Sequence, residues 1–332
     1  PTRTDSETIL GSSIKRSSGG VLPIGYAPEQ FRPRYVDEYT GQVLNPELAR
    51  SAIIEELDYF NSRVWEISTK EEMEAVPGYI YVRSRWVCCN KGDDLMPDVR
   101  CRLVACEINK GGDRPDHFFA STPPLEAKKL LFARFAQERM RSGHHLQLSF
   151  VDVRKAYFNG IPRRPVFMQF PKELGLPNNL VAKLVRCADG TRDAGAIWED
   201  AYRGALESLG FVSGISSPCV FYHPSREIHT VVHGDDFTSM GVKSELDWLE
   251  TEFAKHFELK IRGRLGEDCS GPQEIRILNR IVTLGADGLT YEADPRHVDL
   301  LSSSLGLTSA NSVATTGVKE HNPDYASQNE SE

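Results

Sequence analysis

Alternation of apolar and polar residues marks three β-strands in the middle of the chain. Residues 145–152 read H-L-Q-L-S-F-V-D, so Leu146, Leu148, Phe150 and Asp152 lie on one face of the first strand. Two further apolar runs, 219–223 and 228–233, are separated by the turn residues P-S-R-E. This pattern predicts a β-hairpin over the two runs.

Three segments have the 3.6-residue periodicity of amphipathic helices. The first begins at Pro123-Pro124 and runs to about residue 140, and the second runs from about 193 to 209, where Gly210 ends it. The third runs from Ser244 to about 257, and Ser244 with Asp247 predicts a capping box. This order of elements predicts an α+β fold, with an antiparallel sheet and helices packed on one face of it.

The two ends of the chain lack periodicity. Residues 1–48 are rich in Ser, Gly, Pro and Arg and are expected to be a flexible linker or tail, and residues 320–332 a disordered acidic tail. The chain opens with P-T-R-T-D, without the features of a signal peptide, and is expected to be a piece of a larger intracellular protein that is not secreted. Its apolar runs are shorter than the roughly 18 residues of a membrane span, so no membrane partner is expected.

The formal net charge of −8 at first argues against a nucleic-acid partner, but the charge is unevenly distributed. Residues 62–230 hold 24 basic and 20 acidic side chains, whereas residues 231–332 hold 9 and 18. The middle of the chain is therefore mildly basic. That balance permits contact with a phosphate backbone without demanding it.

Seven cysteines are an odd number, and without a secretory signal they are expected to be reduced. Four of them and one histidine are candidates for a zinc site: Cys88, Cys89, Cys101, Cys106 and His117. None has the C-x-x-C spacing that lets two thiolates bind one tetrahedral ion. Buried thiols are therefore the preferred interpretation.

Carboxylates occur at two places where a soluble fold has no structural need for them. Asp152 lies on an apolar strand face, where an unpaired charge is costly. Asp235 and Asp236 follow the apolar run V-V-H and Gly234, and adjacent like charges there repel unless a cation lies between them. Each motif alone is also an ordinary strand end or hairpin turn. Together, three carboxylates could hold two Mg²⁺ or Mn²⁺ ions, which suits an in-line phosphoryl transfer.

The surroundings of these carboxylates resemble a known family. A strand that ends in Asp152, followed by a helix and a hairpin with two aspartates, resembles the palm of reverse transcriptases. The chain resembles the copia retrotransposon type over roughly residues 55 to 305. The matching stretches stand in order: W-V-C-C-N-K-G-D-D (86–94), C-R-L-V-A-C (101–106), D-H-F-F-A-S-T-P-P (116–124), V-D-V-R-K-A-Y-F-N-G (151–160), V-F-M-Q-F-P (166–171), A-K-L-V-R-C-A-D-G-T-R-D-A-G-A-I-W (182–198), L-G-F-V-S-G-I-S-S-P-C-V-F-Y (209–222), H-G-D-D (233–236) and F-E-L-K-I-R-G-R-L-G (257–266).

The resemblance implies an RNA-directed DNA polymerase of the Pol polyprotein, with a right-hand fold. A fingers-like part would span 49–145, a palm 146–260, and a connection or thumb-like segment 261–319. The enzyme would add deoxynucleoside triphosphates to a primer on an RNA or DNA template, with two Mg²⁺ or Mn²⁺ ions. Its other partners would be the remaining modules of the polyprotein. Its location would be the cytoplasm, virus-like particles or the nucleus.

The resemblance also assigns roles to single residues. The metal-binding residues would be the three carboxylates, Asp152, Asp235 and Asp236. Lys155 and Ala156 would offer backbone N–H groups to the triphosphate. Tyr157 would obstruct a 2′-hydroxyl and so favour deoxynucleotides, and Arg102 would reach the phosphates from the fingers.

Two motifs depart from the family's pattern. Asp193 stands where the family has a glutamine that contacts the incoming nucleotide, and Arg192 is the expected cation beside it. His233 and Gly234 replace the Tyr-Val pair before the aspartates. Neither change removes a metal ligand, but both lower the expected efficiency.

Two alternatives stay open. His229 and His233 point to the same side of a strand and, with Asp235, could form the transition-metal site of a hydrolase. The chain could also be a catalytically decayed retroelement fragment that only binds nucleic acid. Asp193 and the H-G-D-D motif favour decay, whereas the presence of all three carboxylates and Tyr157 favours an active enzyme.

Overall fold

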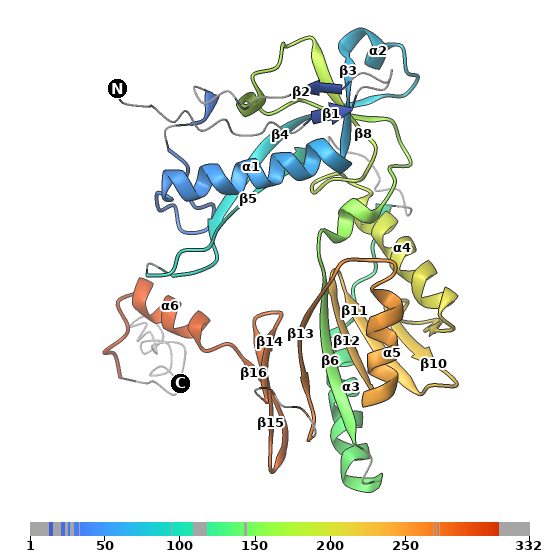
Figure 1. Ribbon diagram of the computed structural model, residues 1–332. Helices are drawn as coiled ribbons and strands as arrows, with labels where there is room; N and C mark the ends of the chain where they lie inside the picture. The colour runs from blue at the N-terminus through green and yellow to red at the C-terminus, as the bar shows by residue number, and fades with distance from the viewer. Residues whose placement is uncertain are drawn as a thin grey trace, which may run out of the picture. The chain divides into compact units, whose positions relative to one another are not determined.

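The computed structural model describes residues 13–15, 21–23, 26, 30–32, 34–93, 95–108, 118–142, 145–267, 269, 271 and 273–311, and the chain divides after Gln273 into two units. The first unit contains a six-stranded sheet, ordered β13-β6-β12-β11-β10-β9, in which all neighbours are antiparallel (Figure 1). Its strands are β6 (Leu146–Val153), β9 (Val212–Ser213), β10 (Val220–His223), β11 (Ile228–His233), β12 (Asp236–Val242) and β13 (Leu259–Leu265). The predicted first strand and the predicted hairpin are confirmed.

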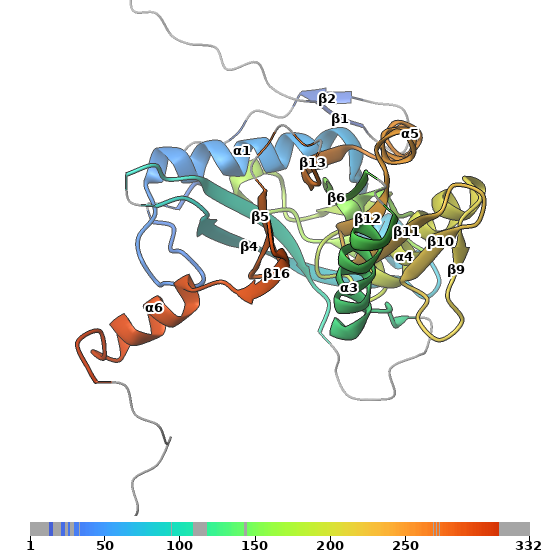
Figure 2. The ribbon, with the colours of Figure 1, turned by 90° about the horizontal axis from the view of Figure 1, so that it is seen from below.

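Helices cover both faces of this sheet (Figures 1 and 2). They are α3 (Leu125–Ser142), α4 (Ala194–Ser208) and α5 (Lys243–Phe253). On one face the rings of Phe132 in α3 and Phe150 are 6.5 Å apart, and on the other the rings of Phe253 in α5 and Phe237 are 5.0 Å apart. The α+β class is confirmed, but the expectation of helices on one face is wrong. Phe150 on one side of the β6–β12 pair and Val151 with Phe237 on the other are all buried, so both faces require cover.

The predicted helices are present with shifted ends. α5 begins after Val242 without a side-chain cap, so the capping box predicted from Ser244 and Asp247 is wrong. The carboxylate of Asp247 instead forms ion pairs with Lys243 at 2.7 Å and Arg264 at 2.7 Å. Among the residues that the structure describes, no helix combines the length and the apolar character needed to cross a membrane.

A second sheet in the same unit has the order β3-β8-β7-β4-β5 and is antiparallel except between β4 and β7. Its strands are β3 (Trp65–Thr69), β4 (Ile80–Asn90), β5 (Val99–Cys106), β7 (Val166–Met168) and β8 (Leu180–Leu184). The same unit includes α1 (Pro46–Arg63), α2 (Lys70–Glu74), the 3-10 turns η3 (Ala156–Asn159) and η4 (Lys172–Leu174), and the pair β1 (Ser13–Lys15) and β2 (Val21–Pro23). Because β7 and β8 follow β6, this sheet takes strands from both the expected fingers range and the expected palm range.

Part of the segment expected to be a linker packs against α1. Tyr35 and Leu44 are buried in the same apolar cluster as Ile53 of that helix. The side chain of Asn45 caps α1 by accepting hydrogen bonds from the backbone N–H of Glu47 and of Leu48. Residues 34–45 therefore belong to the folded unit. The expected acidic tail, 320–332, lies outside the described residues.

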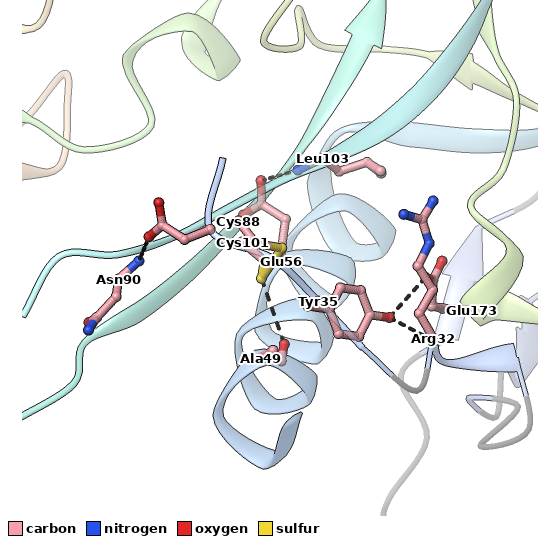
Figure 3. The surroundings of a disulfide bond; sticks show 10 residues. Arg32, Tyr35, Ala49, Glu56, Cys88, Asn90, Cys101, Leu103 and Glu173 are labelled. Atoms are coloured by element: carbon pink, nitrogen blue, oxygen red, sulfur yellow. Dashed lines mark hydrogen bonds between the residues drawn. A yellow bond between two sulfur atoms is a disulfide. The ribbon is translucent and has the colours of Figure 1, made fainter. Parts of the chain in front are cut away.

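Cys88 and Cys101 form a disulfide across the β4–β5 pair, where they are register partners (Figure 3). The expectation of reduced cysteines is therefore wrong for this pair. The disulfide results from strand pairing, because opposite positions on antiparallel strands bring Cβ atoms close together whatever the sequence spacing. Cys89 and Cys106 keep free thiols, and His117 lies outside the described residues.

The second unit is a small antiparallel sheet followed by a helix. Its elements are β14 (Glu274–Ile277), β15 (Arg280–Gly285), β16 (Gly288–Ala293) and α6 (Arg296–Ser304). The buried carboxylate of Asp294 forms ion pairs with Arg276 of β14 at 2.8 Å and Arg296 of α6 at 2.8 Å, which tie the sheet to the helix. The boundary expected after residue 260 falls inside β13, which belongs to the first unit.

The turn before α4 lies directly against β5. The backbone N–H of Ala105 donates to the Asp189 carbonyl at 2.7 Å, and Gly190 adopts a φ of +86°. A Cβ atom on Gly190 would lie 2.1 Å from the Ala105 carbonyl oxygen. Only glycine fits this backbone conformation and this close approach.

We expect Gly190→Ala to lower the free energy of unfolding by about 2 kcal/mol or more, through backbone strain and overpacking. The matched control is Gly204→Ala inside α4, where an added Cβ meets no atom within 4 Å. It should raise the free energy of unfolding by roughly 0.5–1 kcal/mol. Urea denaturation followed by circular dichroism measures both values. A neutral Gly190→Ala would contradict the packing of this turn.

Candidate active site

Strand pairing brings two of the predicted carboxylates together. Asp152 of β6 is the register partner of Asp236 of β12. The β11–β12 hairpin closes between His233 and Asp236, so Gly234 and Asp235 form its two-residue loop. Gly234 adopts a φ of +65°, which such a loop favours and which glycine tolerates. Asp235 is exposed in this loop, next to the carboxylate pair.

The hairpin loop is held from two sides. The indole Nε1 of Trp198 in α4 donates to the Gly234 carbonyl at 2.9 Å. The backbone N–H of Val153 donates to the Asp235 carbonyl at 2.9 Å. These bonds fix the loop to the end of β6, so all three aspartates lie at one end of the central strand pair.

A cation lies between the two paired carboxylates. Arg262 forms an ion pair with Asp152, and its Nη2 atom lies 3.2 Å from Oδ1 of Asp236. Arg262 is the extra residue of an irregularity in β13, because Ile261 pairs with β6 and the next paired residue is Gly263. Sequence reasoning missed Arg262, since its place beside the carboxylates depends on the register of β13 against β6, which the local sequence does not give.

Burial disfavours the charged form of the Asp236 carboxylate. The residue is 8% exposed, and burial raises the pKa of its carboxyl above the usual range. Arg262 opposes that shift, Asp235 adds to it, and Lys128 and Asp152 act in smaller measure, the first lowering and the second raising this pKa. Nearby positive charge therefore stabilises the ionised form of this buried carboxylate.

Lys128 is a second cation at this end of the sheet, and sequence reasoning missed it. It is 2% exposed, and its Nζ atom has no hydrogen-bond partner in the described part of the chain. Burial lowers the pKa of its ammonium group to about 8, and Asp236 partly opposes this shift. A signal was present, because Lys128 lies in register with the buried Leu131, Phe132 and Phe135 on the apolar stripe of its helix.

The turn after β6 carries the residues assigned to the triphosphate. Lys155 adopts a left-handed conformation with a φ of 52°, and Ala156 is buried. The ammonium group of Lys155 pairs with the buried carboxylate of Glu56 and lies 4.6 Å from the ring centre of Tyr59. Within the described residues, the backbone N–H groups of 155, 156 and 157 have no acceptor. The Lys155 side chain is therefore engaged, whereas the backbone of the turn stays available.

Tyr157 faces a group of charged residues. It is 38% exposed, and burial, followed by the charges of Asp235 and Asp189, raises the pKa of its hydroxyl, while Arg102 opposes the shift. Arg102 is exposed on β5. The pKa of the Asp189 carboxyl is raised by burial, against Arg102 and Lys155. Sequence reasoning missed Asp189, and no feature of its local sequence marks it as part of this group.

The carboxylate of Asp193 is engaged in an ion pair. It is 2% exposed, and its carboxylate accepts two hydrogen bonds from Arg164, from Nε at 2.9 Å and from Nη2 at 2.7 Å. The same guanidinium donates to both carboxylate oxygens of Glu107, at 2.6 and 3.1 Å. The expectation that Arg192 offsets Asp193 is therefore wrong, because Arg164 forms this ion pair.

Arg192 has a different set of contacts. Its backbone N–H donates to Oε2 of Glu107 at 2.8 Å, and its guanidinium carbon lies 4.8 Å from the ring centre of Phe118. It forms no ion pair within 4 Å to any residue of the described part of the chain. Its charge is therefore available to an anion, such as a phosphate.

The histidines of β11 do not form a metal site with Asp235. The ring of His229 stacks on Tyr222 at 4.5 Å, and burial, followed by the charge of Arg134, lowers the pKa of His229 to about 4. No group of three His, Cys, Asp or Glu side chains among the residues with described positions is arranged to hold a metal ion. The hydrolase alternative thus lacks a ligand cluster.

Asp152, Asp235 and Asp236 likewise do not form a ready-made group of three metal ligands among the described residues. Asp152 and Asp236 are oxygen donors of the kind that Mg²⁺ and Mn²⁺ prefer, and the buried Asp236 needs a counter-charge. Their chemistry therefore fits a divalent cation, while Arg262 supplies the counter-charge in this arrangement. Asp235 lies close enough to act on the pKa of Asp236, but the three carboxylates do not converge on one point.

No protein-family model matches the chain. Two similar solved structures are apo telomerase from Candida tropicalis, truncated from its C-terminal domain, and telomerase from Candida albicans in complex with a fragment of telomeric RNA. The first has a TM-score of 0.45 and 6% identity over 78% of this chain and 63% of that one. The second has a TM-score of 0.46 and 8% identity over 75% of this chain and 50% of that one. This chain spans less than two thirds of the length of either telomerase chain. Because both similarities are weak, the function is argued from the site alone.

We expect Lys128→Met to raise the free energy of unfolding at pH 7 by about 1–3 kcal/mol, because it removes a buried charge that has no hydrogen-bond partner. The folded-state pKa of about 8 lies below the ordinary 10.5, so the unfolded chain binds this proton more tightly. Wild-type stability is therefore lost as the pH falls from about 10.5 to 8. The advantage of Lys128→Met should be largest below pH 8 and shrink towards pH 10.

Urea denaturation at pH 7 and pH 10 tests this expectation. The matched control is Lys129→Met, which changes the adjacent exposed lysine of the same helix and should stay within about 0.5 kcal/mol of the wild type. A gain that is equal at both pH values would show that the charge of Lys128 is not its source.

Proposed function

We propose that the chain is the reverse transcriptase domain of a copia-type retrotransposon, an RNA-directed DNA polymerase. The observation that carries the proposal is the register pairing of Asp152 with Asp236, with Asp235 in the loop between β11 and β12. These residues come from two of the motifs that resemble the family. They meet at the end of a central strand pair, which is the arrangement that the resemblance implies.

The residues proposed to hold two Mg²⁺ or Mn²⁺ ions are Asp152, Asp235 and Asp236. Such ions would stabilise the attacking and leaving oxygens of phosphoryl transfer. The protein's part is to fix the carboxylates on rigid strands and to balance their charge. The anchoring of the Gly234–Asp235 loop by Trp198 and Val153 suits that role.

Contacts to the incoming nucleotide would come from the turn after β6 and from β5. The unpaired backbone N–H groups of residues 155–157 can donate to phosphate oxygens. Arg102 and Arg192 have guanidinium groups that no carboxylate of the described chain holds within 4 Å. Asp193 would act from a distance, because its bonds with Arg164 support the turn that presents Arg192.

The template would contact the fingers-like hairpin. Four exposed arginines lie on one face of the β4–β5 pair: Arg83, Arg85, Arg100 and Arg102. Arg85 and Arg100 already pair with Glu38 and Asp98, but these are exposed pairs that phosphates can replace. A row of arginines at alternate strand positions suits a nucleic-acid backbone.

A second candidate is a decayed fragment that binds nucleic acid without polymerising. The observation that favours it is Arg262, which lies between the paired carboxylates where a metal would be needed. The arginine face of β4 and β5 would serve this function equally well. Primer extension separates the two candidates.

We expect the chain to extend oligo(dT) on poly(rA) with Mg²⁺ or Mn²⁺. Asp152→Asn, Asp235→Asn and Asp236→Asn should each lower the rate at least about a hundredfold, equivalent to roughly 2.7 kcal/mol of transition-state stabilisation. The matched control is Asp200→Asn, an exposed carboxylate of α4 paired with Arg163. It should leave the rate unchanged.

No extension with either metal would sink the polymerase proposal and leave the nucleic-acid-binding candidate. Extension that Asp235→Asn does not alter would show that the site is misassigned.

We expect Tyr157→Val to raise the ratio of ribonucleotide to deoxynucleotide incorporation about tenfold or more, because the ring no longer obstructs a 2′-hydroxyl. The matched control is Tyr81→Val on β4, since Tyr81 is 41% exposed and Tyr157 is 38% exposed. Single-nucleotide incorporation kinetics give both ratios. An unchanged ratio in Tyr157→Val would remove this residue from the nucleotide site.

A further inference from the structure

We propose that Arg262 is the resident counter-ion of the carboxylate site, and that a divalent metal ion binds Asp152 and Asp236 only by displacing its guanidinium group. Arg262 thereby sets the metal concentration that the site requires. This inference rests on the metal-binding role given to these carboxylates in the proposed function.

The contacts of Arg262 coincide with those that a metal would need. Its guanidinium group pairs with Asp152 of β6 and lies 3.2 Å from Oδ1 of Asp236 in β12, so one cation bridges both strands. A carboxylate oxygen that accepts a hydrogen bond from a guanidinium N–H has fewer lone pairs to offer a metal ion. The guanidinium group and the metal ion therefore compete for the same oxygens.

Removal of the guanidinium group is structurally feasible. β13 is an edge strand of the sheet, and Arg262 is the unpaired residue at its irregularity. Its side chain is 33% exposed, so the group can move into solvent without breaking the β6–β12 pair. An arginine in a regular central strand would lack this freedom.

The second cation cannot take part in such an exchange. Lys128 is 2% exposed on α3, and its Nζ atom has no hydrogen-bond partner in the part of the chain that the structure describes. It supplies fixed positive charge near Asp236 whether or not a metal ion is bound. Of the two cations, Arg262 is therefore the one that can leave.

Displacement has a measurable consequence for metal affinity. A guanidinium-bound state that outnumbers the open state by roughly ten to one raises the apparent dissociation constant of a metal ion about tenfold. Substitution of Arg262 by a neutral residue removes this competition. It also leaves two facing carboxylates without a mobile counter-ion, so the metal ion should stabilise the variant more than the wild type.

The experiment is a Mn²⁺ titration of the full chain without nucleic acid, followed by the electron paramagnetic resonance signal of free Mn²⁺. Arg262→Gln should bind Mn²⁺ at least about tenfold more tightly than the wild type. Arg262→Lys, which keeps the charge but loses the planar fork, should fall between the two. Adding Asp236→Asn to Arg262→Gln should abolish the gain. Circular dichroism verifies that each variant is folded.

The matched control is Arg154→Gln, because Arg154 lies two residues from Asp152 and its exposed side chain pairs with Glu258 at 2.9 Å. It removes one positive charge near the site without freeing the carboxylates. Its Mn²⁺ affinity should stay within about threefold of the wild type, as expected for a screened surface charge.

The outcomes separate this inference from the proposed function. Equal Mn²⁺ affinity in wild type and Arg262→Gln, lost in Asp152→Asn, overturns the role of Arg262 but leaves a metal site on the carboxylates. An equal gain in Arg154→Gln and Arg262→Gln also overturns it, because net charge alone would then explain the change. Absence of Mn²⁺ binding in every variant overturns both the inference and the metal role of the carboxylates.

Discussion

Two carboxylates that face each other across a central strand pair are the constraint on which the candidate site depends. The β6–β12 register fixes Asp152 opposite Asp236, and packing on both faces of the sheet keeps that register from slipping. Like charges held this close require a cation. Arg262, at the irregularity of the edge strand β13, lies between the two carboxylates and supplies this cation.

The same constraint explains the neighbouring turn and loop. The backbone turns directly after β6, where Lys155 adopts a left-handed conformation. The ammonium group of Lys155 pairs with the carboxylate of Glu56 in α1. The loop at Gly234 is held by Trp198 of α4. Residues from both sheets and their helices therefore converge at the end of β6. Rigid support of this kind is what a site for charged substrates needs.

Local features of the chain could be predicted from the sequence, whereas long-range pairings could not. Alternation located β6 and the hairpin of β10 and β11, because each depends on a few consecutive residues. The two carboxylate motifs could be located because Asp152 and the Asp235-Asp236 pair each follow an apolar run, whereas their meeting was implied only by the family resemblance. Arg262 could not, since its contact with the carboxylates depends on the register of β13 against the distant strand β6 and on an irregularity between Ile261 and Gly263.

Other pairings between distant segments likewise could not be predicted from the local sequence. The Cys88–Cys101 disulfide depends on the register of β4 against β5, and the loop between them is too long to fix that register from sequence. Arg164 pairs with Asp193 and Glu107, residues 29 and 57 positions away. Nothing in the local sequence distinguishes Arg164 from an exposed arginine. Adjacency in sequence instead favours Arg192 as the partner of Asp193.

The distribution of satisfied and unsatisfied charges indicates where function lies. Asp193 and Glu56 are buried, yet each has a cationic partner within bonding distance, as structural charges do. Lys128 is equally buried and has no hydrogen-bond partner among the described residues, and burial raises the pKa of Asp236. Apolar residues at these two positions would favour folding more. Unfavourable charges kept at one end of one strand pair are a physical argument for the proposed site at that end.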